Sequence, residues 1–158
     1  MIKVFISHKK EDSAYALLVK RAFDDLSVES YLDLLDDSVN GGGKALTDHI
    51  KSNLNDCTDI IVVMSEATKR SWWVPFEIGM AAQTNMPTAS YLTSSVSLPE
   101  YLDYWPRLKS ISDIAKYVYV RKRIALNYIS RDPHTYTRGG YRHLETPAFY
   151  NQLKYELR

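Results

Sequence analysis

The chain has 158 residues and a formal net charge of +1, and 45% of its residues are hydrophobic and 25% charged. This size and balance suit a single domain with a hydrophobic core, and they exclude a chain that is disordered throughout. No apolar run reaches the length of a membrane span, the first residues lack the features of a signal peptide, and the single cysteine, Cys57, has no disulfide partner, so we expect a cytoplasmic protein.

The periodicity of apolar residues predicts an alternation of strands and helices. Ile60 to Met64 is an unbroken apolar run, which is typical of a strand in the centre of a parallel sheet. Ser71 and Ser112 are expected to cap helices, and Thr146 with Pro147 is expected to begin the last one. In chain order, the expected elements are strand 2–7, helix 12–26, strand 30–32, helix 44–55, strand 60–64, helix 71–84, strand 87–92, strand 108–111, helix 113–129 and helix 146–157.

This order of elements predicts an α/β fold in which helices cover both faces of a parallel sheet of four to five strands. Ligands of such folds bind outside the carboxyl ends of the strands. The loops at that edge are expected to run from Ser7 to Asp12, from Asp33 to Lys44 and from Ser65 to Glu77. Any chemistry of the chain is therefore expected to depend on these three loops.

The segment from Ser71 to Glu77 holds the clearest candidate residues. If Ser71 caps the helix, Glu77 lies in its second turn, and Trp73 lies on the same face four residues earlier. A flat ring can stack on this indole while the carboxylate binds a ribose hydroxyl or stabilises a developing positive charge. The alternative is structural: Trp72 and Trp73 anchor the core, and Glu77 complements the helix dipole.

A glycine-rich stretch precedes the second expected helix. The backbone amides of Gly42 and Gly43, together with the ammonium of Lys44, suit a phosphate group at the start of a helix. The spacing of these residues is not that of a Walker A motif. A surface loop without a catalytic role is the alternative interpretation.

Three carboxylates, Asp33, Asp36 and Asp37, follow the second expected strand. Such a cluster suits a Mg²⁺ ion beside a phosphate, as in receiver domains. A receiver domain also needs an aspartate at the end of its central strand, where this chain has Met64 and Ser65. We therefore do not expect a receiver domain.

Ser7 and His8 end the first expected strand at the same edge. The chain contains no G-x-S-x-G nucleophile elbow, so a Ser/His/Asp hydrolase is not expected, and we interpret His8 as a polar residue at the rim rather than a general base. None of the histidines has metal-ligand spacing with Cys57, so no metal site is expected.

The C-terminal part of the chain differs in charge from the rest. Residues 1–120 hold 12 Lys and Arg against 16 Asp and Glu, whereas residues 121–158 hold 8 against 3. The basic residues alternate with tyrosines, a pattern that suits nucleic-acid binding but equally a helix that packs its tyrosines on the body. We favour packing, with residues 1–129 as the main domain and residues 130–158 as an extension of a loop and a helix.

Taken together, these pieces resemble the Toll/interleukin-1 receptor (TIR) domain family over about residues 1–125. The matching stretches are Val4-Phe5-Ile6-Ser7-His8 with Glu11-Asp12, Tyr31-Leu32-Asp33 with the glycine-rich loop, Ile60 to Ser65, and Ser71-x-Trp73-x-x-x-Glu77. The chain resembles bacterial stand-alone TIR proteins with a short C-terminal extension, such as those of Thoeris-type anti-phage defence.

The resemblance implies a flavodoxin-like three-layer sandwich and, for many members, cleavage of the bond between nicotinamide and ribose in NAD. Glu77 takes the position of the catalytic glutamate, and Trp73 takes that of a pocket residue. The loop from Asp33 to Lys44 takes the place of a segment that gates the site or mediates assembly. The residues expected to contact the nucleotide are Ser7, His8, Asp33, Gly42, Gly43, Lys44, Ser71 and Trp73.

We therefore expect an enzyme that takes NAD as its substrate, needs no bound cofactor, and makes nicotinamide and an ADP-ribose-derived nucleotide signal. The expected partners are other copies of the chain, through TIR–TIR contacts, and a downstream effector.

Two alternatives remain open. One is a non-catalytic module that only docks on other TIR domains, although the chain lacks the loop proline of animal adapters. The other is a nucleoside deoxyribosyltransferase-like enzyme, whose Tyr and Asp signature is not evident near the first helix. The chain also departs from the family at one position of the motif: the residue after the tryptophan is often cysteine, and here it is Val74.

Overall fold

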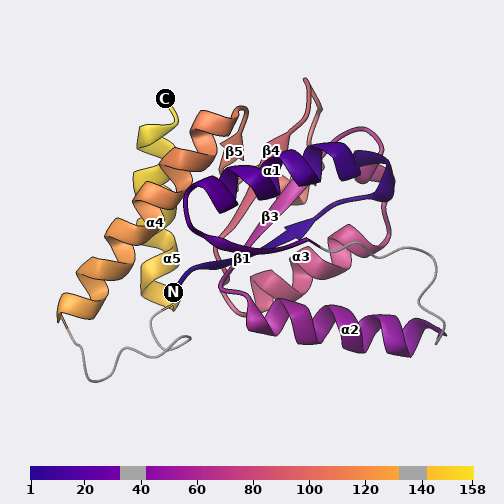
Figure 1. Cartoon of the computed structure of the whole chain (residues 1–158), viewed down its shortest axis with the longest axis horizontal. Coiled ribbons are helices and arrows are strands. Elements are labelled where there is room, and N and C mark those ends of the chain that lie inside the picture. Colours follow the sequence, from indigo (N-terminus) through magenta and orange to yellow (C-terminus); the bar gives the residue numbers. More distant parts are fainter. Residues whose placement is uncertain (33–41, 132–141) are drawn as a thin grey trace.

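The computed structural model describes residues 1–32, 42–131 and 142–158, and within them it has a parallel sheet of five strands (Figure 1). The strands lie in the spatial order β2-β1-β3-β4-β5. They are β1 (Lys3–Ser7), β2 (Glu29–Leu32), β3 (Asp59–Met64), β4 (Thr88–Leu92) and β5 (Arg107–Leu108). This is the strand order of flavodoxin-like folds, in which the order reverses between β1 and β3.

Helices cover both faces of this sheet. They are α1 (Ser13–Asp25), α2 (Gly42–Asp56), α3 (Trp73–Gln83), α4 (Ile111–Arg131) and α5 (Arg142–Glu156), with the 3-10 turns η1 (Lys10–Asp12), η2 (Thr68–Arg70) and η3 (Glu100–Leu102). In Figure 1, α2 and α3 lie together on one side of the sheet, α1 lies on the other, and α4 and α5 run side by side. The predicted α/β sandwich is confirmed. No helix in the described ranges is long and apolar enough to cross a membrane.

The central strands contribute to two hydrophobic cores, because successive side chains of a strand point to opposite faces of the sheet. Val4 and Ile6 belong to the core shared with α1, α4 and α5, whereas Phe5 belongs to the core shared with α2 and α3. Every residue of β3 is buried, as its unbroken apolar run predicts. Cys57, just before β3, is also fully buried and packs as a small apolar side chain.

The start of α4 differs from the prediction. The helix begins at Ile111, and Ser112 lies inside its first turn. Ser110 takes the capping position instead, since its Oγ accepts the amide of Asp113 at 3.3 Å. The prediction of Ser112 as the cap was wrong because Ser110 and Ser112 both lie near the start of this helix, and only the path of the backbone shows which of them accepts the amide. The preceding strand, β5, accordingly ends at Leu108.

The start of α5 also differs from the prediction. The helix begins at Arg142, so Pro147 lies inside it rather than at its first position. A proline there removes one backbone hydrogen bond near the beginning of the helix. Thr146 donates its hydroxyl to the carbonyl of Asn85 at 2.7 Å. The predicted start was wrong because Thr146 binds another part of the chain instead of capping its own helix.

A buried ionic cluster joins β3 to α4 and α5 at the amino edge of the sheet. Arg121 donates through Nε to Asp59 at 2.6 Å and through Nη1 to Glu145 at 2.5 Å. Tyr117 donates its hydroxyl to Asp59 at 2.7 Å, and the Arg121 guanidinium lies 5.2 Å from the ring centre of Phe149. Buried charges persist only when they are paired and hydrogen-bonded, so this cluster attaches α5 to the body. The division of the chain at residue 129 stays a prediction.

Candidate functional site

The carboxyl edge of the sheet brings together two polar side chains from distant parts of the chain. Ser7 is the last residue of β1, and Glu77 lies in the second turn of α3. The Ser7 hydroxyl donates a hydrogen bond to Oε2 of Glu77. Glu77 exposes 3% of its surface and Ser7 exposes none. The carboxylate therefore lies in surroundings of low dielectric constant, where its charge acts strongly on a neighbouring group.

The beginning of α3 determines where Glu77 is placed. Ser71 has the extended backbone angles of a cap residue, φ −72° and ψ 144°, and its Oγ accepts the amides of Trp73 at 3.2 Å and Val74 at 3.3 Å. Pro75 follows in the first turn, where its missing N–H would have no helical partner. The predicted cap at Ser71 is confirmed. A contact between Ser71 and a nucleotide stays a prediction.

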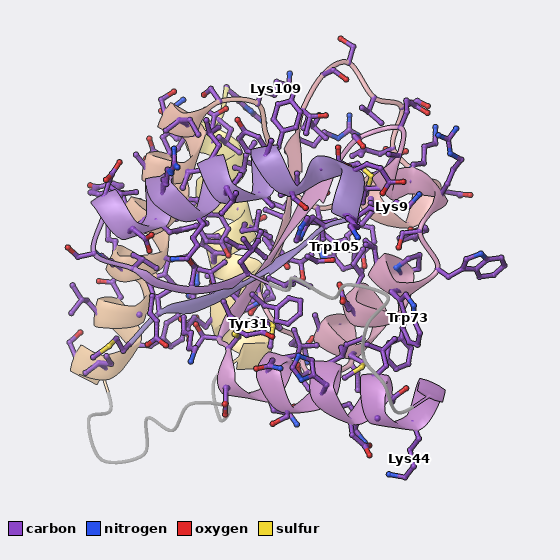
Figure 2. The ribbon with its side chains drawn as sticks, turned by 45° about the vertical axis from the view of Figure 1, so that its right-hand side comes forward. Lys9, Tyr31, Lys44, Trp73, Trp105 and Lys109 are labelled. Atoms are coloured by element: carbon purple, nitrogen blue, oxygen red, sulfur yellow. The ribbon has the colours of Figure 1, made fainter. Side chains whose placement is uncertain are left out.

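Aromatic side chains gather at the same end of α3. Trp73 is 40% exposed and meets the ring of Phe76 edge-on, with 5.9 Å between the ring centres. Trp72 is 91% exposed, so the alternative that both tryptophans anchor the core is wrong. Figure 2 shows Trp73 at the margin of the molecule beside α3, where its ring is accessible. Phe76 was not among the residues predicted from the sequence, where its one signal is its place directly before Glu77.

A second buried carboxylate ties the loops of this edge together. Asp12 accepts hydrogen bonds from Ser65 Oγ and Thr68 Oγ1, both at 2.5 Å, across 53 and 56 residues of sequence. Thr68 also accepts the amide of Lys9 at 3.2 Å. The loop after β1 is thus attached to the loop after β3. From the sequence, Asp12 is predicted only as the start of a helix, because nothing local indicates hydrogen-bond partners so far along the chain.

His8 follows Ser7 at this edge and is partly buried. Its Nε2 lies 3.3 Å from Ser13 Oγ, and its Nδ1 is a buried atom with no hydrogen-bond partner within the described part of the chain. Burial lowers the pKa of His8 below its ordinary value of 6.5, although the backbone of Ile6 and the charge of Asp12 raise it in part. The imidazole is therefore neutral at pH 7, which suits an uncharged group of a ligand.

The glycine-rich residues are placed at the beginning of α2. Gly42 and Gly43 are its first two residues, and the space where a Gly43 Cβ would lie is open. Lys44 is exposed and forms an ion pair with Asp48 of the same helix. In Figure 2, Lys44 points away from the rest of the chain. The structure does not bring Lys44 to Glu77, and phosphate binding by these residues stays a prediction.

The acidic residues after β2, Asp33, Asp36 and Asp37, lie outside the described residues. Across 1–32, 42–131 and 142–158, no three His, Cys, Asp or Glu side chains come together as metal ligands would. The structure does show a buried carboxylate, Glu77, that is oriented by the Ser7 hydroxyl. The accessible rings of Trp73 and Phe76 lie on the same helix. Such an arrangement can stabilise positive charge on a ligand whose flat ring stacks nearby.

Three comparisons relate the chain to known proteins. The family model of the TIR domain matches residues 4–123, and no curated protein sequence matches the chain. Among solved structures, a 2-deoxyribosyltransferase from Bacillus psychrosaccharolyticus has 10% identity and a TM-score of 0.59, covering 71% of this chain and 89% of that one. The TIR domain of the Toll-related receptor TRR-2 from Hydra magnipapillata has 16% identity and a TM-score of 0.57, covering 76% and 93%. The TIR domains of the activated Roq1 resistosome, which recognises the pathogen effector XopQ, have 13% identity and a TM-score of 0.47, covering 98% and 84%.

The sequence identities to these structures are low, so the first two likenesses support the parallel-sheet fold alone. The family match carries more, because it covers most of the chain. It includes Ser7, Glu77 and the aromatic residues at the start of α3. The resemblance that the motifs indicate and the family match therefore agree.

Proposed function

Since the chain belongs to the TIR domain family, we propose that it cleaves the bond between nicotinamide and ribose in NAD, with Glu77 as the catalytic residue. The observation that carries this proposal is the Glu77 carboxylate, which is buried at the carboxyl edge of a parallel sheet and hydrogen-bonded to Ser7. Trp73, four residues earlier on the same helix, exposes its ring. The family includes NAD-cleaving enzymes that use a glutamate at this position.

The proposed reaction needs one well-placed carboxylate. Nicotinamide in NAD is bonded through a positively charged nitrogen, so it leaves as a neutral molecule without being protonated. As the bond to C1′ breaks, its electron pair goes to that nitrogen and positive charge develops on the ribosyl group. A carboxylate beside the ribose stabilises this charge, directly or through the 2′- and 3′-hydroxyls. Water then adds to C1′ and loses a proton, which gives ADP-ribose; an internal nucleophile gives a cyclic isomer, and an external one gives a conjugate.

The other residues of the edge fit the binding of NAD as a substrate, and the proposed reaction requires no bound cofactor. The rings of Trp73 and Phe76 present apolar surface on which a flat base stacks. His8 is neutral and suits a sugar or amide group of the nucleotide. The further residues that we propose to contact the nucleotide are Asp33, Gly42, Gly43, Lys44 and Ser71.

The product is proposed to act as a nucleotide signal. The resemblance to stand-alone bacterial TIR proteins favours a role in anti-phage immunity, in which a downstream effector reads this nucleotide. A neighbouring copy often completes the site of a TIR enzyme, so self-association through TIR–TIR contacts is part of the proposal. We therefore expect activity at protein concentrations that promote assembly and little activity in the isolated monomer.

Release of nicotinamide from NAD at high protein concentration tests the proposal. Glu77→Gln preserves the size of the side chain and removes its charge, and we expect the rate to fall by about 100- to 1000-fold. Glu66→Gln is the matched control, because the Glu66 side chain is 62% exposed on the loop after β3. This control is expected to keep the wild-type rate. Equal rates for the wild type and Glu77→Gln would contradict the catalytic role.

The same assay separates the alternative functions. Light scattering shows whether the protein assembles, and assembly without nicotinamide release would favour a module that only docks on other TIR domains. Transfer of deoxyribose from one nucleoside to another base would favour a deoxyribosyltransferase-like enzyme. The likeness to that enzyme concerns the fold alone, at 10% identity.

A further inference from the structure

Ser7 occupies the ligand-binding edge, yet its hydroxyl is engaged by another residue of the chain. We propose that Ser7 is a positioning residue, whose hydroxyl holds the Glu77 carboxylate in one orientation and in its ionised form without contacting the substrate. This inference rests on the proposed function of Glu77. It gives Ser7 a different role from the nucleotide contact that the sequence predicts.

Burial and bonding separate Ser7 from a ligand. Ser7 exposes none of its surface, and its hydroxyl donates to Oε2 of Glu77. A hydroxyl has a single proton, so Ser7 cannot donate to a substrate while this bond exists. The effect of Ser7 on the reaction therefore passes through Glu77.

Both ends of this hydrogen bond are attached to well-packed backbone. Ser7 lies opposite Val62 in the register of β1 and β3. Glu77 follows the capped first turn of α3, and its neighbours Val74 and Ile78 are buried in the core against the sheet. A glutamate side chain rotates about three bonds, and a buried hydrogen bond at its tip restricts all of them. Ser7 thereby keeps the carboxylate in place before a substrate arrives.

A hydroxyl orients a carboxylate without cancelling its charge. Donation of a hydrogen bond to an ionised carboxylate favours the ionised form over the protonated form. The positive charge that develops on the ribosyl group is stabilised only by the ionised form. A serine at the end of β1 is therefore suited to this task, whereas a cation in its place would pair with Glu77 and weaken the field at the substrate.

Ser90 provides a matched control within the same sheet. It lies in β4 and, like Ser7, exposes none of its surface. Its Oγ has no hydrogen-bond partner among the residues that the structure describes. Ser7→Ala and Ser90→Ala remove the same atom from buried strands, but only Ser7→Ala removes a hydrogen bond from a carboxylate.

Titration of Glu77 tests the inference directly. Protein labelled with ¹³C at the glutamate carboxyl carbons is followed by NMR against pH, and loss of one resonance in Glu77→Gln identifies Glu77. In Ser7→Ala we expect the midpoint of this titration to move up by about one pH unit, because a hydrogen bond to a charged group is lost. In Ser90→Ala the midpoint is expected to stay in place. Equal midpoints in the two variants would overturn the inference.

Kinetics connects the same bond with the reaction. For Ser7→Ala we expect the acidic limb of the pH profile of kcat/KM to move to higher pH by about one unit. We also expect kcat to fall about tenfold, while KM for NAD stays close to the wild-type value. A raised KM with an unchanged kcat would show that Ser7 binds the substrate, and would overturn the inference. Lack of nicotinamide release by the wild type counts against the proposed function alone, because the NMR midpoint decides on Ser7 whether or not NAD is cleaved.

Discussion

Two buried carboxylates at opposite edges of the sheet are held by different kinds of partner. Asp59, the first residue of β3, accepts hydrogen bonds from the Arg121 guanidinium at 2.6 Å and the Tyr117 hydroxyl at 2.7 Å. Glu77, at the carboxyl edge, accepts a hydrogen bond from the Ser7 hydroxyl. Both carboxylates are almost completely removed from solvent. Their burial is therefore alike, and the chemistry of the donor distinguishes them.

The donor indicates what each carboxylate does. Burial disfavours the charged form of Arg121, but Asp59 and Glu145 outweigh this effect and raise the pKa of the guanidinium. These ion pairs join α4 to β3 and to α5. Ser7 is a neutral donor, so its hydrogen bond does not cancel the charge of an ionised Glu77. The partner of a buried carboxylate, more than its burial, therefore separates a structural role from a chemical one.

The largest expected effect concerns the ionic cluster. Arg121→Met keeps an unbranched side chain but leaves Asp59 and Glu145 buried without their cation, so we expect the free energy of unfolding to fall by about 3–5 kcal/mol. Urea denaturation measures this change. Lys122→Met, at an exposed neighbouring position, is the control and is expected to change stability by less than about 0.5 kcal/mol. A loss of similar size in both variants would show that the cluster does not hold α5 in place.

The aromatic residues of the carboxyl edge come next in expected effect. Trp73→Ala removes the accessible ring beside Phe76, and we expect KM for NAD to rise about tenfold, since stacking of a base on an aromatic side chain contributes roughly 1–3 kcal/mol. Steady-state kinetics of nicotinamide release measures it. Trp72→Ala is the matched comparison, because Trp72 is 91% exposed and precedes α3. If Trp72→Ala had the larger effect on KM, the assignment of the stacking surface would be incorrect.

A smaller effect is expected at the cap of α3. Ser71→Ala removes the acceptor of the Trp73 and Val74 amides, so the free energy of unfolding is expected to fall by about 1 kcal/mol. Thermal unfolding measures the loss. Ser71→Asp restores an acceptor and is expected to recover the wild-type stability, because aspartate is an equally good cap. Equal stability of the alanine and wild-type proteins would show that the cap does not support α3.

The smallest effect concerns pH. Burial lowers the pKa of His8 below 6.5, so the folded chain keeps this imidazole neutral while the unfolded chain takes up a proton as the pH falls below 6.5. Protonation thus favours the unfolded state, and stability from this residue is present above pH 6.5 and declines below it. With His8→Asn, the unfolding free energy is expected to fall less between pH 7 and pH 5 than it does in the wild type. The difference is expected to be small, because the His8 ring is partly exposed. Urea denaturation across that range, with His49→Asn at an exposed position as the control, measures the difference; identical pH dependence in the wild type and His8→Asn would contradict it.

Local patterns were sufficient to place the elements of the carboxyl edge. The apolar run of β3 identifies a central strand, and the cap at Ser71 with the four-residue spacing of Trp73 and Glu77 predicts the start and register of α3. The wrong predictions have two causes. Near the start of α4, Ser110 caps the helix where Ser112 was predicted to do so. Thr146 is of a residue type that often caps helices, but it donates its hydroxyl to the carbonyl of Asn85 instead.

The sequence by itself thus determined the order of strands and helices, the fold class and the residue types at the edge of the sheet. Only the tertiary structure decided which side chains meet: Ser7 and Glu77 are 70 residues apart, and Asp59 and Arg121 are 62 residues apart. The physical reason is the separation along the sequence over which each kind of interaction acts. The residue patterns that predict helices and strands are local, whereas a side-chain hydrogen bond requires its two atoms to lie about 3 Å apart. That distance is reached only when the sheet and its helices have packed.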